Sequence, residues 1–466
     1  MGARVLVGCV VALALPAPAL AGTATVKDDH DPRSGDITQN VVYTAKPGER
    51  NDLTIAARQS DVELRDAAGI TPGRQCSRPN PADPTRVICR ANREGDFNGF
   101  AGVKLRDGDD RARVTEGSAT IDGGTGNDTL VGGPGYGTLM IGGKGNDDMQ
   151  GGAGRDSFDE AGAHNGSDTI RGGAGEDDVD YSLRSADLRV SLDAKRNDGA
   201  RGERDLVAAD VEKVDAGSGN DRLIGNRFDN ILQGATGSDF VSGRAGDDLV
   251  DAGRNDAAGE RPARSRDRVK AGPGDDVLFG AGRGTVLDGG SGHDDFIGSE
   301  GSDRIRARDG QSDSISCYRG RDRVSADGHD FVAGDRDTGR CERVRRRGAA
   351  VAVAVGEPFV NDPGPLSVNS PGGQTGFSVA CPVDGPRICR GSVIATLEGF
   401  PLGRRAFRLR RGRSKDLSFT APPGRRQELL SRPRLRLRAR VVSHDRRGRA
   451  RSVRDRFAVK VVAQAP

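Results

Sequence analysis

A six-residue phrase, Gly-Gly-x-Gly-x-Asp, constrains this chain more than any other feature, because it recurs without change five times. The strict copies occupy residues 123–128, 142–147, 151–156, 172–177 and 289–294. Five further copies change one glycine but keep the fourth-position Gly and the final Asp, and they end at Asp221, Asp239, Asp248, Asp276 and Asp303. With Gly at 69 of 466 residues, chance gives well under about one strict copy. The phrase is therefore a structural repeat.

Each phrase opens a nine-residue unit of the form GGxGxDxUx, where U is a large apolar residue. We predict that a unit forms a six-residue turn and a three-residue strand, in an array spanning residues 104–344. Only 34% of the chain is hydrophobic and Trp is absent, which argues against one large globular core. A narrow core would instead be built from the U residues, which are Leu130, Met149, Phe158, Ile170, Val179, Leu223, Val241, Val250, Leu278, Phe296, Ile305, Ile315 and Val324.

Two segments interrupt the array. Residues 181–215 contain the alternating sequence from Leu188 to Leu192, which predicts a strand, and a polar loop around Asn197. Residues 254–270 are charged and are typical of a surface loop. We expect both segments to project from one edge of the array.

The spacing of the repeat suits a metal ion. Three glycines remove Cβ atoms from the turn, so carbonyl oxygens can converge on one point, to which the sixth-position Asp adds carboxylate oxygen. Hard oxygen ligands in a flexible ring favour Ca²⁺ over Zn²⁺ or Mg²⁺. If two strands make one coil, turns on the same side lie 18 residues apart, as Asp110 and Asp128 do. The predicted ligands of several Ca²⁺ ions are Asp110, Asp128, Asp147, Asp156, Asp168, Asp177, Asp221, Asp239, Asp248, Asp276, Asp294, Asp303, Asp313 and Asp322.

Three turns depart from the pattern. Gly137, Asn230 and Thr285 stand where the ligand Asp is expected. We predict that the turns containing them hold Ca²⁺ poorly or not at all.

These repeats resemble the RTX, or haemolysin-type calcium-binding repeat, family of secreted bacterial proteins, whose nonapeptide is GGxGxDxUx. The resemblance covers about half the chain and implies a parallel β-roll with Ca²⁺ held in its turns. Many members of this family leave the cell through a C-terminal signal, whereas this chain has features of an N-terminal one.

Residues 1–21 have the features of a secretory signal peptide. Arg4 precedes the apolar run VLVGCVVALAL, and the segment ends in Ala19-Leu20-Ala21, so we expect cleavage before Gly22 and an extracellular protein. An alternative interpretation makes Cys9 a lipid-attachment site. No other apolar run approaches the ~18 residues that a membrane-spanning helix needs.

The remaining six cysteines form three pairs of sequence neighbours, in a pattern typical of an oxidising compartment. Fifteen pairings are possible, and nearest-neighbour pairing places one disulfide in each presumed module. The expected disulfides are Cys76–Cys89, Cys317–Cys341 and Cys381–Cys389.

Modules of a different character flank the array. Residues 22–103 predict a small β-module that caps it, residues 345–373 a linker, and residues 374–466 a basic antiparallel β-sandwich. From residue 349 onward the chain has 23 Lys and Arg against 8 Asp and Glu. In residues 434–441 Arg alternates with apolar residues, which predicts a strand with one arginine-coated face. That face suits an anionic envelope polymer or polysaccharide, or serves only to keep the module soluble. Interleaved aromatic residues, which specific binding of single-stranded nucleic acid would use, are missing there.

The sequence offers no catalytic motif. Five histidines provide no HExxH metal site, and no GxSxG nucleophile turn exists. We therefore expect an all-β, calcium-binding, non-catalytic secreted protein. The alternatives are a surface adhesion or matrix protein anchored through its basic module, and a hydrolase whose site lies unrecognised in an end module.

Overall fold

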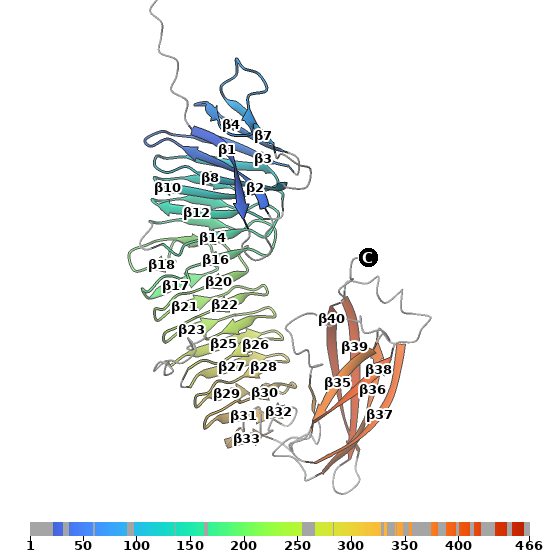
Figure 1. Cartoon of the computed structure of the whole chain (residues 1–466). Helices are drawn as coiled ribbons and strands as arrows, with labels where there is room; N and C mark the ends of the chain where they lie inside the picture. The colour runs from blue at the N-terminus through green and yellow to red at the C-terminus, as the bar shows by residue number, and fades with distance from the viewer. Residues whose placement is uncertain are drawn as a thin grey trace, which may run out of the picture. The chain divides into compact units, whose positions relative to one another are not determined.

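The computed structural model is all-β in its described part (Figure 1). The chain divides into two compact units, one ending at Asp178 and one beginning at Val179. No helix that could cross a membrane occurs among the described residues. The structure describes residues 22–460 except 31–36, 59–60, 91–96, 136, 163–165, 254–265, 283, 328–329, 333–340, 342, 348–353, 357–373, 381–387, 398–399, 411–413, 421–433 and 445–449. The predicted signal peptide lies outside these residues.

In the first unit, short strands alternate between two parallel sheets, so that every second strand pairs with its neighbour one coil away. Each coil thus consists of two strands and two turns, as the resemblance implied. One sheet contains β8 (Phe97–Lys104), β10 (Ser118–Thr125), β12 (Leu139–Lys144) and β14 (Ser157–Asp159). The other contains β9 (Arg111–Glu116), β11 (Thr129–Val131), β13 (Asp148–Gln150) and β15 (Thr169–Arg171).

The N-terminal module extends both sheets of this unit. Its strand β2 pairs in parallel with β8, and its strand β3 pairs in parallel with β9. Beyond them the pairing becomes mainly antiparallel, and the predicted Cys76–Cys89 disulfide joins β6 to β7. The strands of the module are β1 (Gly22–His30), β2 (Ile37–Ala45), β3 (Asp52–Ala57), β4 (Asp61–Asp66), β5 (Ile70–Pro72), β6 (Cys76–Ser77) and β7 (Arg86–Arg90).

The second unit repeats the two-sheet arrangement. One sheet contains β20 (Lys213–Asp215), β22 (Ile231–Gln233), β24 (Leu249–Asp251), β26 (Val277–Phe279), β28 (Asp295–Ile297), β30 (Ser314–Ser316) and β32 (Phe331–Val332). The other contains β18 (Gly199–Ala200), β17 (Leu188–Ser191), β21 (Arg222–Ile224), β23 (Phe240–Ser242), β25 (Arg268–Pro273), β27 (Val286–Ser291), β29 (Arg304–Ala307), β31 (Arg323–Asp327) and β33 (Arg343–Arg347). Two more short strands are β16 (Asp178–Asp180) and β19 (Leu206–Val207).

The U residues form the core of the repeats, as predicted. Each of the thirteen is at most 2% exposed, because strand residues alternate in direction and the middle residue of a three-residue strand points inward. They stack on one another along the parallel ladders; Leu223, for example, is the register partner of Val241. Each sheet therefore contributes a single row of apolar side chains to a narrow core.

The first interruption differs from the expectation that it projects from the array, and the second is shorter than predicted. Within residues 181–215, β17 pairs in parallel with β21, so this segment contributes a strand to the array. At the second interruption, β25 begins at Arg268 and pairs with β23, so the array resumes earlier than predicted. Residues 254–265 lie outside the described residues.

The C-terminal residues form two antiparallel sheets. One contains β34 (Ala354–Gly356), β35 (Gln374–Ala380) and β38 (Ser414–Thr420), and the other contains β36 (Ile388–Leu397), β37 (Phe400–Arg410), β39 (Arg434–His444) and β40 (Ala450–Lys460). On β37, Phe407 is buried while Arg408 is exposed, as the alternating pattern predicts. The predicted Cys317–Cys341 disulfide is present, whereas Cys381 of the third pair lies outside the described residues.

Candidate metal centre

A ladder of aspartates runs through the turns of the array. The backbone N–H of Asp110 donates a 2.8 Å hydrogen bond to Oδ1 of Asp128, 18 residues on, and the N–H of Asp128 donates a 2.7 Å bond to Oδ1 of Asp147. The bond recurs in the second unit, where the N–H of Asp221 donates to Oδ1 of Asp239 at 2.8 Å. Side chain and backbone thus link each coil to the next at the sixth position of the turn.

All fourteen predicted ligands belong to such ladders, and each is at most 3% exposed. In every case Oδ1 accepts a hydrogen bond from the backbone N–H of the preceding coil or, for Asp110, from Asn51 of the N-terminal module. The structure therefore places every predicted ligand at an equivalent position of a ladder; these residues are Asp110, Asp128, Asp147, Asp156, Asp168, Asp177, Asp221, Asp239, Asp248, Asp276, Asp294, Asp303, Asp313 and Asp322.

Two ladder members are not among the predicted ligands. Asp267 accepts from the N–H of Asp239 at 3.0 Å, and Asp330 accepts from the N–H of Asp313 at 3.4 Å. Asp267 was assigned to a surface loop because it lies 28 rather than 18 residues after Asp239. The apolar Val269 two residues later was the available signal, since every predicted ligand except Asp110 precedes a U residue at that spacing.

One of the three predicted substitutions is displaced by one residue. Thr138, not Gly137, occupies the ladder position, because its N–H donates to Oδ1 of Asp156 at 2.6 Å. The turn before it is one residue longer than the consensus. Asn230 and Thr285 occupy ladder positions as predicted, and their N–H groups donate to Asp248 and Asp303.

The second side-chain oxygen separates two kinds of turn. In a closed turn, the backbone N–H four residues earlier donates to that oxygen, as Gly152 does to Asp156 at 2.6 Å and Ser299 to Asp303 at 2.7 Å. Two turns without an aspartate are closed in the same way, because Ala281 donates to Oγ1 of Thr285 at 2.9 Å and Asn226 donates to Oδ1 of Asn230 at 2.8 Å. Protein groups alone satisfy the side chain in these turns.

We call a turn open where Oδ2 is buried without a hydrogen-bond partner among the described residues and the second turn residue has a positive φ, for example 99° at Gly124 and 100° at Gly143. Even Ala235 (58°) and Arg244 (82°) adopt this conformation, which is unfavourable for a residue with a Cβ. The open turns contain Asp110, Asp128, Asp147, Asp239, Asp248, Asp276 and Asp294.

Gly152 and Ser299 of the closed turns have no positive φ. Oδ2 of Asp221 and of Asp313 is also buried and unpaired among the described residues, but the second residue of each of these turns has no positive φ, so they are not counted as open.

The first glycine of an open turn leaves space beside the unpaired oxygen. A Cβ added to Gly123 would lie 2.4 Å from Oδ2 of Asp128 and 2.7 Å from the carbonyl oxygen of Gly142 in the next coil. The described residues contain no cluster of three or more acidic, His or Cys side chains, so a cation here would also use backbone carbonyls. A carboxylate and converging carbonyls are the donor set that Ca²⁺ prefers.

Comparison with protein families identifies the array. Its residues match the RTX calcium-binding nonapeptide repeat over residues 106–139, 140–159, 163–182, 215–250, 264–282 and 286–311. These coils are RTX calcium-binding repeats. No curated protein matches the chain.

Burial destabilises the charged form of the aspartates in the RTX array. Desolvation raises the pKa of Asp128 to about 7 and that of Asp294 to about 8, and neighbouring ladder aspartates add to both increases. The pKa of Asp313 rises to about 9 for the same reasons. A bound divalent cation would favour the charged form of these side chains. The raised pKa values and the unpaired oxygens therefore both favour a cation in the open turns.

The first coil of the RTX array is completed by the N-terminal module. The N–H of Asn51 donates a 2.6 Å hydrogen bond to Oδ1 of Asp110, in the place of a preceding coil. The Asn51 amide in turn donates to Oδ2 of Asp66 at 2.9 Å, and the Tyr43 hydroxyl donates to the same oxygen at 2.8 Å. Burial beside Asp66 raises the pKa of Tyr43, so the phenol stays protonated as a donor.

Proposed function

We propose that this is a secreted, non-catalytic protein whose RTX array folds or stiffens when it meets extracellular Ca²⁺. The observation that carries the proposal is the set of open turns, in which a buried carboxylate oxygen has no hydrogen-bond partner in the part of the chain that the structure describes. An unpaired buried carboxylate is destabilising, and a divalent cation removes that penalty. The signal-like N-terminus and the paired cysteines support an extracellular site of action.

The concentration of Ca²⁺ outside cells is enough to control such a fold. A site with a Kd of ~0.1 mM in ~1 mM Ca²⁺ gains about 1.4 kcal/mol. Roughly five such sites give about 7 kcal/mol, which is comparable to the whole stability of a domain. At sub-micromolar Ca²⁺ this gain vanishes, and the small apolar core does not offset the backbone entropy of the array.

Circular dichroism of the full chain in chelator and in millimolar Ca²⁺ tests the proposal. We expect a large gain of β-signal on adding Ca²⁺ and little gain on adding the same concentration of Mg²⁺, which demands a tighter octahedral site. Calorimetric titration should then give a stoichiometry of several ions per chain. A spectrum that Ca²⁺ leaves unchanged would contradict the proposal.

A second candidate function is surface adhesion through the basic C-terminal module. Arg404, Arg408 and Arg410 are all exposed on β37, which favours attachment to an anionic polymer. Retention of the protein on isolated cell envelopes at low salt, and its release at high salt, would support this role. If the envelopes do not retain it at low salt, adhesion through this module is excluded.

A further inference from the structure

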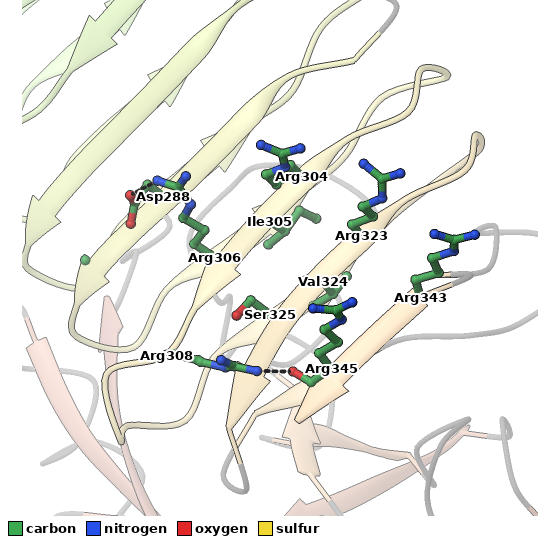
Figure 2. A pocket seen from close by; sticks show the side chains of 11 residues that line it. Asp288, Arg304, Ile305, Arg306, Arg308, Arg323, Val324, Ser325, Arg343 and Arg345 are labelled. Atoms are coloured by element: carbon green, nitrogen blue, oxygen red, sulfur yellow. Dashed lines mark hydrogen bonds and ion pairs between the residues drawn. The ribbon is translucent and has the colours of Figure 1, made fainter. Parts of the chain in front are cut away.

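Two rows of side chains rich in arginine cross the outer face of the last coils of the array. Arg304, Arg323 and Arg343 are register partners on β29, β31 and β33, so they form a row of three on adjacent strands (Figure 2). Their neighbours Ile305 and Val324 are buried, and strand alternation therefore turns the arginines outward. A second row holds Arg306, Ser325 and Arg345.

These rows line a groove of about 660 Å³. Its lining includes six arginines but a single acidic side chain, Asp288. A second groove of about 630 Å³ shares Arg304 and Arg323 with the first and adds Arg266, Arg268 and Arg321. The buried ladder aspartates Asp267 and Asp303 also belong to its lining, so arginines outnumber acidic residues there by five to two. The basic surface therefore continues across the strands from β25 to β33.

Part of this charge is already paired. Arg306 makes a 3.1 Å ion pair with Asp288, and Arg308 donates hydrogen bonds to the carbonyl oxygens of Ala326 and Arg345 (Figure 2). Within the described part of the chain, by contrast, no acidic side chain pairs with Arg304, Arg323 or Arg343. Like charges at a strand spacing of roughly 4.8 Å repel one another, so an anionic ligand would stabilise the row.

We propose that this arginine groove binds a linear polysaccharide that carries sulfate or carboxylate groups. Each guanidinium can hold such a group through two parallel hydrogen bonds. The row crosses successive strands, so it suits a chain with anionic groups at regular intervals. Among the residues that the structure describes, no aromatic side chain lines either groove, which disfavours single-stranded nucleic acid because its bases stack on aromatic rings.

The proposal rests on the calcium-dependent fold, because the arginines come into register only when the coils are formed. The site is distinct from the C-terminal basic module, and it adds an anion-binding face to the array itself. Polysaccharide binding should therefore require Ca²⁺ even though the arginines are not calcium ligands.

The test compares two variants of the full chain that lose the same charge. One is Arg304→Gln/Arg323→Gln/Arg343→Gln in the groove. The other is Arg111→Gln/Arg113→Gln/Arg189→Gln, at exposed arginines of the array that line neither groove. The probes are a sulfated oligosaccharide, an oligouronate and an oligothymidylate of equal charge, measured by calorimetry in millimolar Ca²⁺. We expect the groove variant to bind the better saccharide about tenfold more weakly, since each exposed pair contributes little on its own, and the control variant to bind it as the wild type does.

The saccharide that binds more tightly distinguishes sulfate from carboxylate as the recognised group. Equal weakening in both variants, or tightest binding of oligothymidylate through the groove, would overturn the proposal. Circular dichroism of each sample shows whether the coils are folded, and Arg→Lys at the three groove positions should restore most of the binding. If the difference between wild type and groove variant persists in chelator with β-structure intact, the calcium-dependent fold is wrong while the groove stands. If folding depends on Ca²⁺ but the groove variant binds normally, only the groove is wrong.

Discussion

Whether an aspartate of the array can hold an ion depends on the residue four positions before it. Gly152 donates its N–H to Asp156 and closes the turn, whereas Gly124 has a φ of 99° and Oδ2 of Asp128 lacks a hydrogen-bond partner among the residues with described positions. The free energy of an unpaired buried oxygen is recovered only by a ligand from outside the chain. We therefore expect Asp128 to bind Ca²⁺ and Asp156, although predicted as a ligand, to act as a structural residue.

Replacing one aspartate in each kind of turn tests this distinction. Asp128→Asn keeps the Oδ1 acceptor but removes the charge from an open turn, so the number of bound Ca²⁺ ions should fall. Asp303→Asn places an amide opposite the N–H of Ser299, which should lower stability by about 1–3 kcal/mol without changing the ion count. Calorimetric stoichiometry and thermal unfolding in Ca²⁺ measure the two effects. Loss of ions in the Asp303 variant alone would reverse the assignment.

Filling the space beside an open carboxylate should have the same effect as removing its charge. Gly123→Ala would place a Cβ 2.4 Å from Oδ2 of Asp128, too close for both atoms to stay in place. We expect this variant to lose Ca²⁺ from its turn and to need a higher Ca²⁺ concentration to fold. Gly162→Ala is the matched control, because no atom lies within 4 Å of its added Cβ. Similar calcium titrations for the two variants, followed by circular dichroism, would argue against an ion in this space.

At the scale of strands and turns, the sequence predicts the repeating part well because one apolar residue per strand suffices to specify it. The U residues such as Phe158 and Ile315 are all buried, and the aspartates all join ladders. The two kinds of turn could not be predicted, since GGKGND at 142–147 and GGAGRD at 151–156 have the same consensus. The two turns differ in the backbone φ of their second residue, which is positive at Gly143 and not at Gly152, although both residues are glycine.

Insertions between repeats explain why the ladder position of Asp267 and the pairing of β17 were not predicted. The segment before Asp267 lengthens the coil to 28 residues. A fixed spacing of 18 residues therefore does not predict the ladder position of Asp267. The strand β17 lacks the glycine phrase, yet it pairs in parallel with β21 because Leu188 and Val190 supply the same inward pattern. Pairing of this kind depends on contacts distant in sequence, so local spacing does not reveal it.

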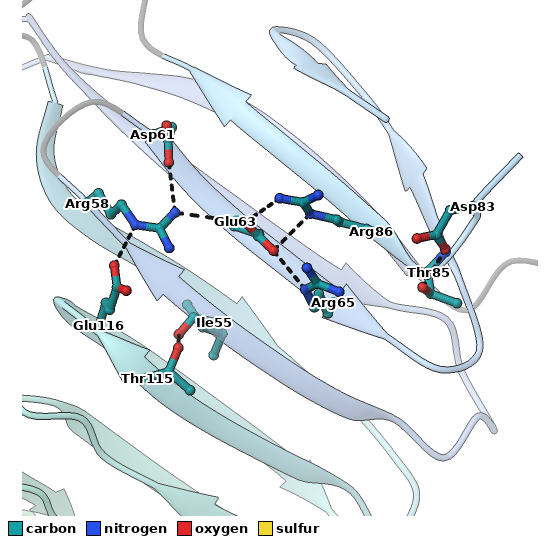
Figure 3. Close-up of polar contacts among 10 residues, drawn as sticks. All are labelled: Ile55, Arg58, Asp61, Glu63, Arg65, Asp83, Thr85, Arg86, Thr115 and Glu116. Atoms are coloured by element: carbon teal, nitrogen blue, oxygen red, sulfur yellow. Dashed lines mark hydrogen bonds and ion pairs between the residues drawn. The ribbon is translucent and has the colours of Figure 1, made fainter. Parts of the chain in front are cut away.

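The cap is the element on which the first coil depends. Besides the parallel pairing of β3 with β9, the Thr115 hydroxyl donates to the carbonyl oxygen of Ile55, and Arg58 forms an ion pair with Glu116 (Figure 3). Glu63 pairs with Arg86 on the cap itself, which lowers its pKa (Figure 3). These exposed pairs contribute little each, so the buried Tyr43 network should matter more.

Removing the Tyr43 hydroxyl tests that network. Tyr43→Phe leaves the phenyl ring buried but takes one donor from the buried carboxylate of Asp66, so we expect a loss of about 1–2 kcal/mol in cap stability. Hydrogen exchange at the amides of β3 and β9 measures it. Thr115→Val, which removes only a partly buried hydroxyl, is the control and should change exchange less. Equal protection in wild type and the Tyr43 variant would show that the network does not support the cap.

At the scale of the whole molecule, many carboxylates are buried together in the aspartate ladders, although the chain has 71 Lys and Arg residues. The strongly shifted aspartates have pKa values raised from 3.8 to between about 6 and about 9. A raised pKa means that the folded state binds protons more tightly than the unfolded state does. Protons and Ca²⁺ therefore both stabilise the folded state. Because they bind the same carboxylates, each opposes binding of the other.

The calcium-free protein should accordingly become more folded as the pH falls. Stability from these aspartates is fully present below pH ~4, where both states are protonated, and is lost as the pH rises through about 6 to 9. Circular dichroism in chelator should show more β-structure at pH 5 than at pH 8, and the Ca²⁺ concentration needed for folding should rise at pH 5 because protons compete for Oδ2. The Asp128→Asn variant should show a smaller pH response than the wild type, since it has one fewer group to protonate. A calcium-free chain that gains structure on raising the pH would show that the buried carboxylates do not set the stability of the array.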